Sequence, residues 1–102
     1  MKESQLAVKV VGAIRERGHY AVKLGGGPYQ TPGLPDVLAV VNGRAVMVEL
    51  KVGSNKPTPL QALTLERLKA AGAVAGVAYT LAEALAMVET AEGLGITPRL
   101  RR

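Results

Sequence analysis

The chain has 102 residues, of which 48% are hydrophobic, so it is long and apolar enough to form one small folded domain and is not a disordered chain. It contains no cysteine and a single histidine, His19, which excludes disulfides, zinc–thiolate centres and thiol nucleophiles and argues against a histidine-rich metal site. The net charge of +5 favours a polyanionic partner such as nucleic acid, and no apolar run approaches the roughly 20 residues that span a bilayer.

The N-terminal segment, residues 2–17, predicts an amphipathic helix. Leu6, Val10 and Ile14 recur at helical spacing and form one apolar stripe. Glu3 falls within this stripe when the residues are projected at about 100° per residue. Two interpretations remain open for this acid. It is either a solvated first-turn residue that complements the helix dipole, or it is directed at the neighbouring edge of a sheet.

A short strand and an irregular loop are expected next. His19–Leu24 predicts the strand, and residues 25–35 contain so many glycines and prolines that regular structure is excluded. The loop matches neither the P-loop nor the GxGxxG pattern, so no nucleotide cofactor is expected. It is either a plain connection or a loop that closes over a polymeric substrate, whose backbone Lys23 and Tyr29 would contact.

The segment Pro35–Lys51 predicts a β-hairpin. Two β-branched apolar runs are joined by Asn42-Gly43, the pair typical of a two-residue type I′ turn. If only these two residues form the loop, Val41 lies opposite Arg44, and the pairing continues from there residue by residue.

The same register places two acids opposite each other at the far end of the hairpin. Counting back from the turn puts Asp36 opposite Glu49, with Lys51 two residues further along the same face. Like charges in opposed positions destabilise a sheet, so we expect a divalent cation to compensate them. Carboxylate oxygens favour Mg²⁺ or Mn²⁺. The alternative is an edge strand whose last residues leave the core and are solvated.

The second half of the chain predicts a helix, a strand and a final helix. Thr58 and Gln61 form a capping box at the start of a helix that begins at Pro59 and ends at Gly72. A buried strand follows at residues 73–79, and a second capping box opens the last helix, which Gly93 stops. In the helix that begins at Pro59, we expect three side chains to face the sheet: Leu60, either Leu63 or Thr64, and Leu68.

The predicted order of elements is therefore α-β-β-β-α-β-α, an α/β fold. The third and fourth strands are joined through a helix, which favours a parallel pair with a right-handed crossover. We expect a mixed four-stranded sheet with flanking helices, formed by a single domain over residues 1–95. Residues 96–102 carry three arginines and are expected to be a basic C-terminal tail that can contact phosphate.

Three short motifs of this chain lie at separations that fit one family of nucleases. They are Gly33-Leu34-Pro35-Asp36, Glu49-Leu50-Lys51 and Pro59-x-Gln61. In combination they resemble the PD-(D/E)XK nuclease superfamily, specifically its VRR-NUC branch. The likeness runs from Glu3 through the helix that begins at Leu81, and it implies a minimal restriction-endonuclease-like core.

The resemblance also implies a role for each site residue. Asp36 and Glu49 would bind Mg²⁺ or Mn²⁺ together with the main-chain carbonyl of Leu50. Lys51 would position the attacking water and neutralise charge. Glu3 would support metal binding directly or through water, and Gln61, which the capping box also explains, would contact the site.

By the same resemblance the chain is a metal-dependent DNA endonuclease, similar to small homodimeric resolvases of branched DNA such as Holliday junctions. Such a protein acts in the cytoplasm of a bacterial or phage-infected cell, with no membrane attachment. The chain departs from the family in having no arginine near residues 76–79. The alternatives are a flap, nicking or non-specific DNase of the same fold, or a non-catalytic basic module that binds nucleic acid.

Overall fold

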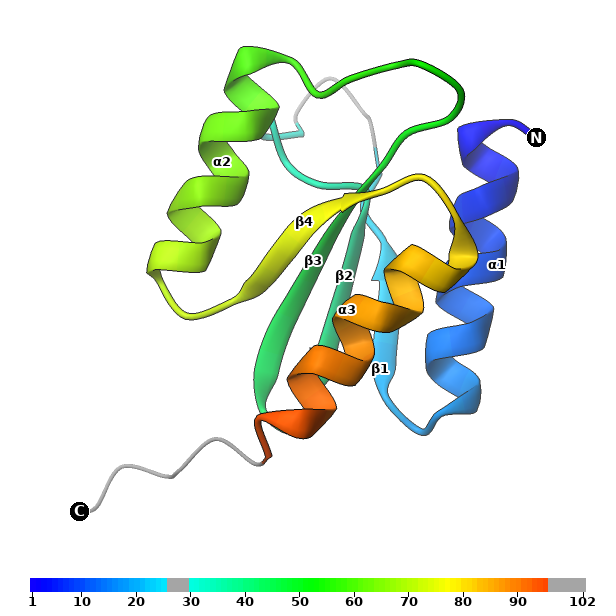
Figure 1. Ribbon diagram of the computed structural model, residues 1–102, viewed down its shortest axis with the longest axis vertical. Coiled ribbons are helices and arrows are strands. Elements are labelled where there is room, and N and C mark those ends of the chain that lie inside the picture. Colours follow the sequence, from blue (N-terminus) through cyan, green and yellow to red (C-terminus); the bar gives the residue numbers. More distant parts are fainter. Residues whose placement is uncertain (26–29, 96–102) are drawn as a thin grey trace.

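The computed structural model describes residues 1–25 and 30–95, and it contains the seven elements in the predicted order. Tyr29 and the predicted basic tail lie outside the described residues. The elements, labelled in Figure 1, are α1 (Glu3–Glu16), β1 (Tyr20–Lys23), β2 (Val37–Val41), β3 (Arg44–Leu50), α2 (Pro59–Ala70), β4 (Val74–Ala78) and α3 (Leu81–Gly93).

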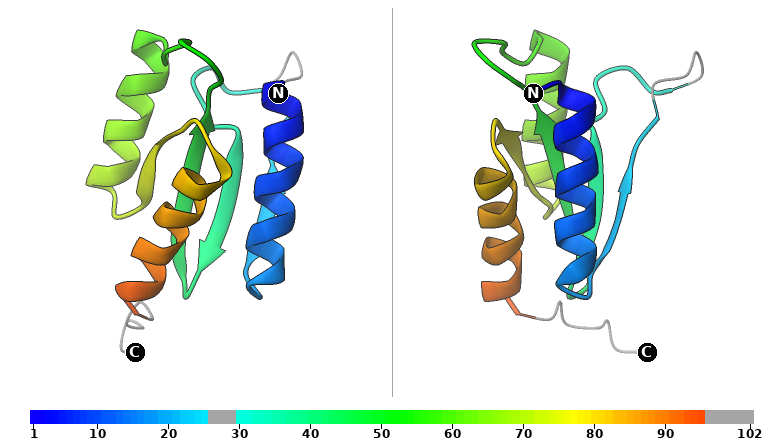
Figure 2. Two further views of the ribbon diagram at one scale, coloured as in Figure 1. Left: turned by 45° about the vertical axis from the view of Figure 1, so that its right-hand side comes forward. Right: turned by 90° about the vertical axis from the view of Figure 1, so that its right-hand side faces the viewer.

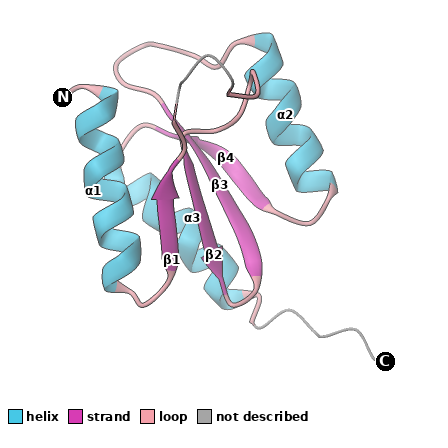
Figure 3. Ribbon diagram, turned by 180° about the vertical axis from the view of Figure 1, so that it is seen from behind, coloured by secondary structure: helices cyan, strands magenta, loops and turns pink. Residues whose placement is uncertain are grey.

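The four strands form one mixed sheet in the order β1-β2-β3-β4. The first two pairs are antiparallel, and β3 and β4 are parallel, as predicted (Figure 3). Asn42 and Gly43 have φ values of 52° and 80°, the positive angles that a type I′ turn requires. Val41 pairs with Arg44, which confirms the predicted hairpin register.

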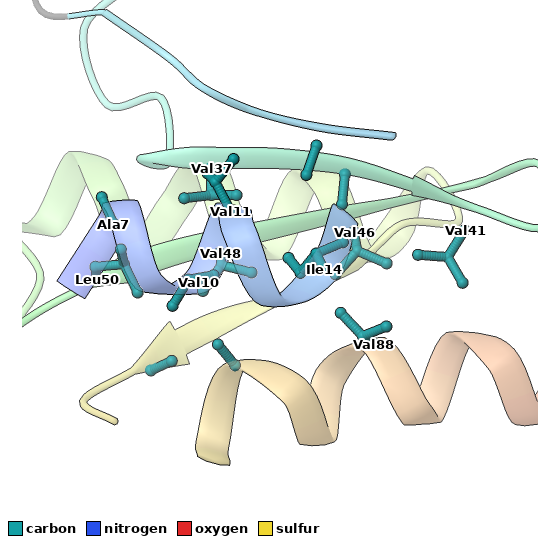
Figure 4. Close-up of a cluster of buried hydrophobic side chains, with 14 of the residues drawn as sticks. Ala7, Val10, Val11, Ile14, Val37, Val41, Val46, Val48, Leu50 and Val88 are labelled. Atoms are coloured by element: carbon teal, nitrogen blue, oxygen red, sulfur yellow. The ribbon is translucent and has the colours of Figure 1, made fainter. Parts of the chain in front are cut away.

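Helices α1 and α3 cover one face of the sheet and contact each other (Figure 2). The main core lies between them and the strands, and the predicted apolar stripe of α1 points into it (Figure 4). Its buried side chains are Leu6, Ala7, Val10, Val11, Ile14, Ala21, Val37, Ala39, Val41, Val46, Val48, Leu50, Ala78, Ala84, Val88 and Ala91. Among the described residues, no helix is long and apolar enough to cross a membrane.

Helix α2 packs on the opposite face, over β4 and the adjoining part of β3. The prediction of which α2 side chains face the sheet was partly wrong. Leu60 and Leu63 are each 46% exposed, whereas Leu65 is 5% exposed. The helix rests on a narrow strip of sheet, so a single stripe through Leu65 and the half-buried Leu68 is covered. Leu60 lies instead beside the turn at Gly33.

All three helices begin at the same edge of the sheet, which is uppermost in Figure 1 (see also Figure 2). We call it the upper edge; β3 ends there at Leu50, β4 ends there at Ala78, and β2 begins there after Asp36. Helix N-termini carry partial positive charge and unpaired N–H groups. The upper edge is therefore suited to negatively charged groups.

Candidate active site

Asp36 is fixed at the upper edge by hydrogen bonds to both neighbouring strands. Its amide donates to the carbonyl of Val48 at 3.0 Å, and its own carbonyl accepts from the amide of Leu24 at 2.8 Å. Its side-chain Oδ2 accepts from the amide of Leu50 at 2.8 Å. The regular β2–β3 ladder ends at Val37, one pair short of the predicted opposition of Asp36 and Glu49, and the Asp36 amide bonds to the carbonyl of Val48, the residue paired with Val37. Asp36 still meets the end of β3, now through its side chain.

The turn before Asp36 needs glycine at position 33. Gly33 has a φ of +83°, and a Cβ there would lie 2.8 Å from Cγ of Leu60 and 2.9 Å from Oγ1 of Thr64. A side chain would therefore be both strained and blocked by α2. Pro35, which is buried, then leads directly into Asp36. The glycine and proline of the Gly33-Leu34-Pro35-Asp36 motif thus have a local role in aiming the acid.

Glu49 is a buried carboxylate at the end of β3, with only 2% of its surface exposed. Its Oε2 lies 3.3 Å from Nζ of Lys51, whose side chain is 13% exposed. Its other oxygen, Oε1, is buried and has no hydrogen-bond partner among the described residues. The backbone of Lys51 is held by a hydrogen bond from its amide to the carbonyl of Ala78 at 3.1 Å.

Burial raises the pKa of Glu49 from 4.5 to about 7, and repulsion by Asp36 and, more weakly, by Glu3 adds to the effect. The hydrogen bond and charge of Lys51 oppose the rise without cancelling it. An ionised carboxylate with one unpartnered buried oxygen, next to a second carboxylate, is a site that a cation would stabilise. The residues present therefore fit a divalent metal ion.

The other two predicted site residues are less closely associated with this pair. Among residues 1–25 and 30–95, no three His, Cys, Asp or Glu side chains lie close enough together to hold a metal ion. Glu3, which is partly buried at the start of α1, contributes only a weak repulsion to Glu49. Gln61 forms the predicted capping box with Thr58. Its side-chain Oε1 accepts from the backbone amide of Thr58 at 2.9 Å, and its backbone amide donates to Oγ1 of Thr58 at 3.2 Å.

Solved structures with this fold carry the VRR-NUC name. A VRR_NUC domain protein superposes with a TM-score of 0.79 at 18% sequence identity, over 100% of this chain and 97% of that one. A second structure, a VRR_NUC domain, is 25% identical with a TM-score of 0.69, over 85% of this chain and 94% of that one. The chain has the fold of these VRR-NUC domains. No family model matches its sequence, and no curated protein matches it either.

The VRR-NUC-like fold is shared more distantly with Hjc, a Holliday junction resolvase from the archaeal hyperthermophile Archaeoglobus fulgidus. That structure superposes with a TM-score of 0.59 at 17% identity, over 76% of this chain and 67% of that one. The common element is the mixed sheet with helices on both faces, which confirms the predicted fold. Together the three likenesses show this fold.

Tyr79 is a residue near the site that the sequence pattern did not identify. It follows β4, in the segment where an arginine was expected, and its hydroxyl donates to the carbonyl of Asn55 at 2.7 Å. Asn55 lies in the loop between Lys51 and α2, so Tyr79 ties that loop to the end of β4. No periodicity or spacing signalled this role, because the contact joins two loops far apart in the sequence.

Proposed function

We propose that the chain is a metal-dependent endonuclease that hydrolyses phosphodiester bonds in DNA, and that it acts on branched DNA such as Holliday junctions. The observation that carries this proposal is the grouping of Asp36, Glu49 and Lys51, in which a buried carboxylate with an unpartnered oxygen lies between a second acid and a lysine. The fold shared with VRR-NUC structures and with a Holliday junction resolvase supports it.

Asp36, Glu49 and the carbonyl of Leu50 would hold the metal, Mg²⁺ or Mn²⁺, with Glu3 assisting through water. When bound, such an ion supplies positive charge that lowers the pKa of water and offsets the charge of a phosphate. The protein's part is to keep the ligands in place. The Leu50 amide orients the carboxylate of Asp36, and the rigid end of β3 orients that of Glu49.

Lys51 would act on the water and on the phosphate. Its ammonium is held beside Glu49, and its backbone is hydrogen-bonded to β4, so its position is fixed before substrate arrives. A fixed cation at this position orients the oxygen of the attacking water and stabilises the negative charge that develops on the phosphate. Gln61, at the first turn of α2, would contact the substrate or the site from the same edge.

The proposed partner is DNA, bound by a homodimer. The net charge of +5 and the three helix N-termini at the upper edge favour a polyanion there. Symmetric cleavage of a four-way junction requires two active sites related by a two-fold axis, which a C2 dimer provides.

The test is cleavage of supercoiled plasmid, linear duplex, a flap and a synthetic four-way junction in Mg²⁺, Mn²⁺ or EDTA. We expect cleavage that requires metal and is fastest on the junction. Faster cleavage of the flap would indicate a flap nuclease instead, and nicking of the plasmid would indicate a nicking DNase. Tight DNA binding without metal-dependent cleavage of any substrate would refute the endonuclease and leave a non-catalytic binding module.

A further inference from the structure

Gly12 is a glycine in the middle of α1 that the fold itself does not require. Glycine destabilises a helix interior relative to alanine, and α1 has the residues of a regular helix on both sides of it. A Cβ built at Gly12 meets nothing within 4 Å. No part of the described chain fills this space, so the helix backbone at Gly12 is open to close approach by a partner.

The surface at Gly12 is a groove of about 360 Å³ between α1 and the end of β1. Its lining includes two apolar side chains, Val11, which is buried, and Val8, which is 71% exposed. Two cations border it, Arg15 and Lys23, and Ala7 completes the lining. The Nε of Arg15 donates to the carbonyl of Ala21 at 3.0 Å, so the guanidinium is anchored to the edge of the groove and keeps other N–H groups for a ligand.

Lys23 also borders a second groove, of about 310 Å³, that leads to Asp36. This one lies between the end of β1 and the Gly33 turn, and it includes polar residues such as Gln30 and Thr31. The two grooves share Lys23, and we call the line of residues from Asp36 through Lys23 to Gly12 and Arg15 the α1–β1 track. Of the described residues that line it, Asp36 is the only acid.

We propose that the α1–β1 track binds the DNA strand that leads away from the scissile phosphate at Asp36. Backbone phosphates would lie at Lys23 and Arg15, and a sugar or base would lie against Gly12 and Val8. This proposal rests on the proposed function, because that function places the scissile phosphate at Asp36.

The charges favour a nucleic acid over a second copy of this chain as the occupant. A second copy docked by the same surface would bring its own Arg15 and Lys23 to a groove that already has two cations and no acid among the described residues that line its Gly12 end. A phosphate backbone brings the opposite charge.

The track is tested by DNA binding in EDTA, where cleavage does not interfere. Fluorescence anisotropy with a labelled four-way junction and a labelled duplex gives the affinity over a salt series. For Lys23→Gln and for Arg15→Gln we expect the slope of log affinity against log salt to fall in magnitude by about 0.9, and the affinity to drop about eightfold at about 0.1 M salt. Lys69→Gln is the matched control, since Lys69 is an exposed lysine at the far end of α2. Its effect on the slope should be negligible.

Gly12→Ala and Gly12→Leu probe the floor of the track. Both should raise the melting temperature, because alanine and leucine favour a helix and the space is free, yet both should weaken DNA binding, the leucine more strongly. Gly93→Ala, at the end of α3, also meets nothing within 4 Å and should leave binding unchanged. A purely structural role for Gly12 would not couple a higher melting temperature to weaker binding.

Three results would overturn the track. The first is that Gly12→Leu binds DNA like the wild type, and the second is that Lys69→Gln lowers the salt slope as much as Lys23→Gln does. The third is that Gly12→Leu turns a dimer into a monomer by light scattering while DNA affinity is unchanged, which would make the groove a contact between copies. If the wild type fails to cleave DNA while the binding pattern holds, the proposed hydrolysis fails and the track stands. If the wild type cleaves DNA and the track variants bind DNA normally, the track fails and the proposed hydrolysis stands.

Discussion

Removing the charge of Glu49 should stabilise the metal-free protein while abolishing its cleavage of DNA. The pKa of this carboxyl is raised from 4.5 to about 7 in the folded state, chiefly by burial. Between those two pH values the folded protein holds a proton that the unfolded chain releases. The stabilising contribution of the protonated acid is therefore complete below 4.5 and is lost as the pH rises to about 7.

The change in unfolding free energy follows from the rise in the pKa of Glu49. At about 1.4 kcal/mol per pH unit, the span from 4.5 to about 7 corresponds to about 3 kcal/mol of unfolding free energy. Glu49→Gln keeps the shape of the side chain and cannot ionise. In EDTA at about pH 8, it should exceed the wild type in unfolding free energy by up to about 3 kcal/mol, and near pH 4.5 the two should be equal.

The assay is denaturant unfolding of both proteins in EDTA at the two pH values, with Glu66→Gln as the control. Glu66 is an exposed acid on α2 paired only with Lys69, so its removal should change stability by less than about 1 kcal/mol. Adding Mg²⁺ at the higher pH should then stabilise the wild type and leave Glu49→Gln unaffected. If Glu49→Gln is no more stable than the wild type at the higher pH, Glu49 does not carry an uncompensated charge and the case for a cation beside it fails.

Three further changes test the surroundings of the site. Lys51→Ala should reduce cleavage of a four-way junction by about 100-fold or more while DNA affinity and its salt dependence, measured by anisotropy, stay unchanged; equal loss of both would make Lys51 a phosphate contact instead. Gly33→Ala should destabilise the protein in thermal unfolding by at least about 1 kcal/mol more than Gly18→Ala, which has the same strain of positive φ but free space for a Cβ. Tyr79→Phe should lower the turnover number more than it changes KM, because it frees the loop at Asn55, and a change in KM alone would contradict that role.

Local rules were sufficient for the hairpin and its acids. The φ angles of Asn42 and Gly43 depend on two residues alone, and a two-residue turn determines the register of the strands beside it. The register in turn brings Asp36 and Glu49 to one end of the sheet. It did not reveal that the ladder stops at Val37 and that Asp36 meets β3 through its side chain, since the hydrogen bond from the Leu50 amide to Oδ2 of Asp36 is not part of the ladder.

Local sequence rules could not predict the features that depend on how the helices pack on the sheet. Leu60 and Leu63 fit an apolar stripe as well as Leu65 does, and only the position of α2 over β4 decides which of them is covered. The same limit applies to Glu3. Its place on the wheel of α1 is a local property, but its distance from Glu49 depends on where α1 begins relative to the upper edge.

The acids at the opposite end of the fold, unlike Glu49, have cationic partners. At the opposite end, Arg17 binds Glu89 at 2.9 Å and Glu92 at 3.1 Å, and His19 contacts Glu92 at 2.6 Å, so the end of α1 is joined to the end of α3. The hydrogen bond from His19 is the main reason that the pKa of Glu92 is lowered. Glu92 is therefore stabilised in its charged form, whereas Glu49 is destabilised in its charged form. Because the unfavourable charge of Glu49 lies at the upper edge, a cation bound there would relieve it.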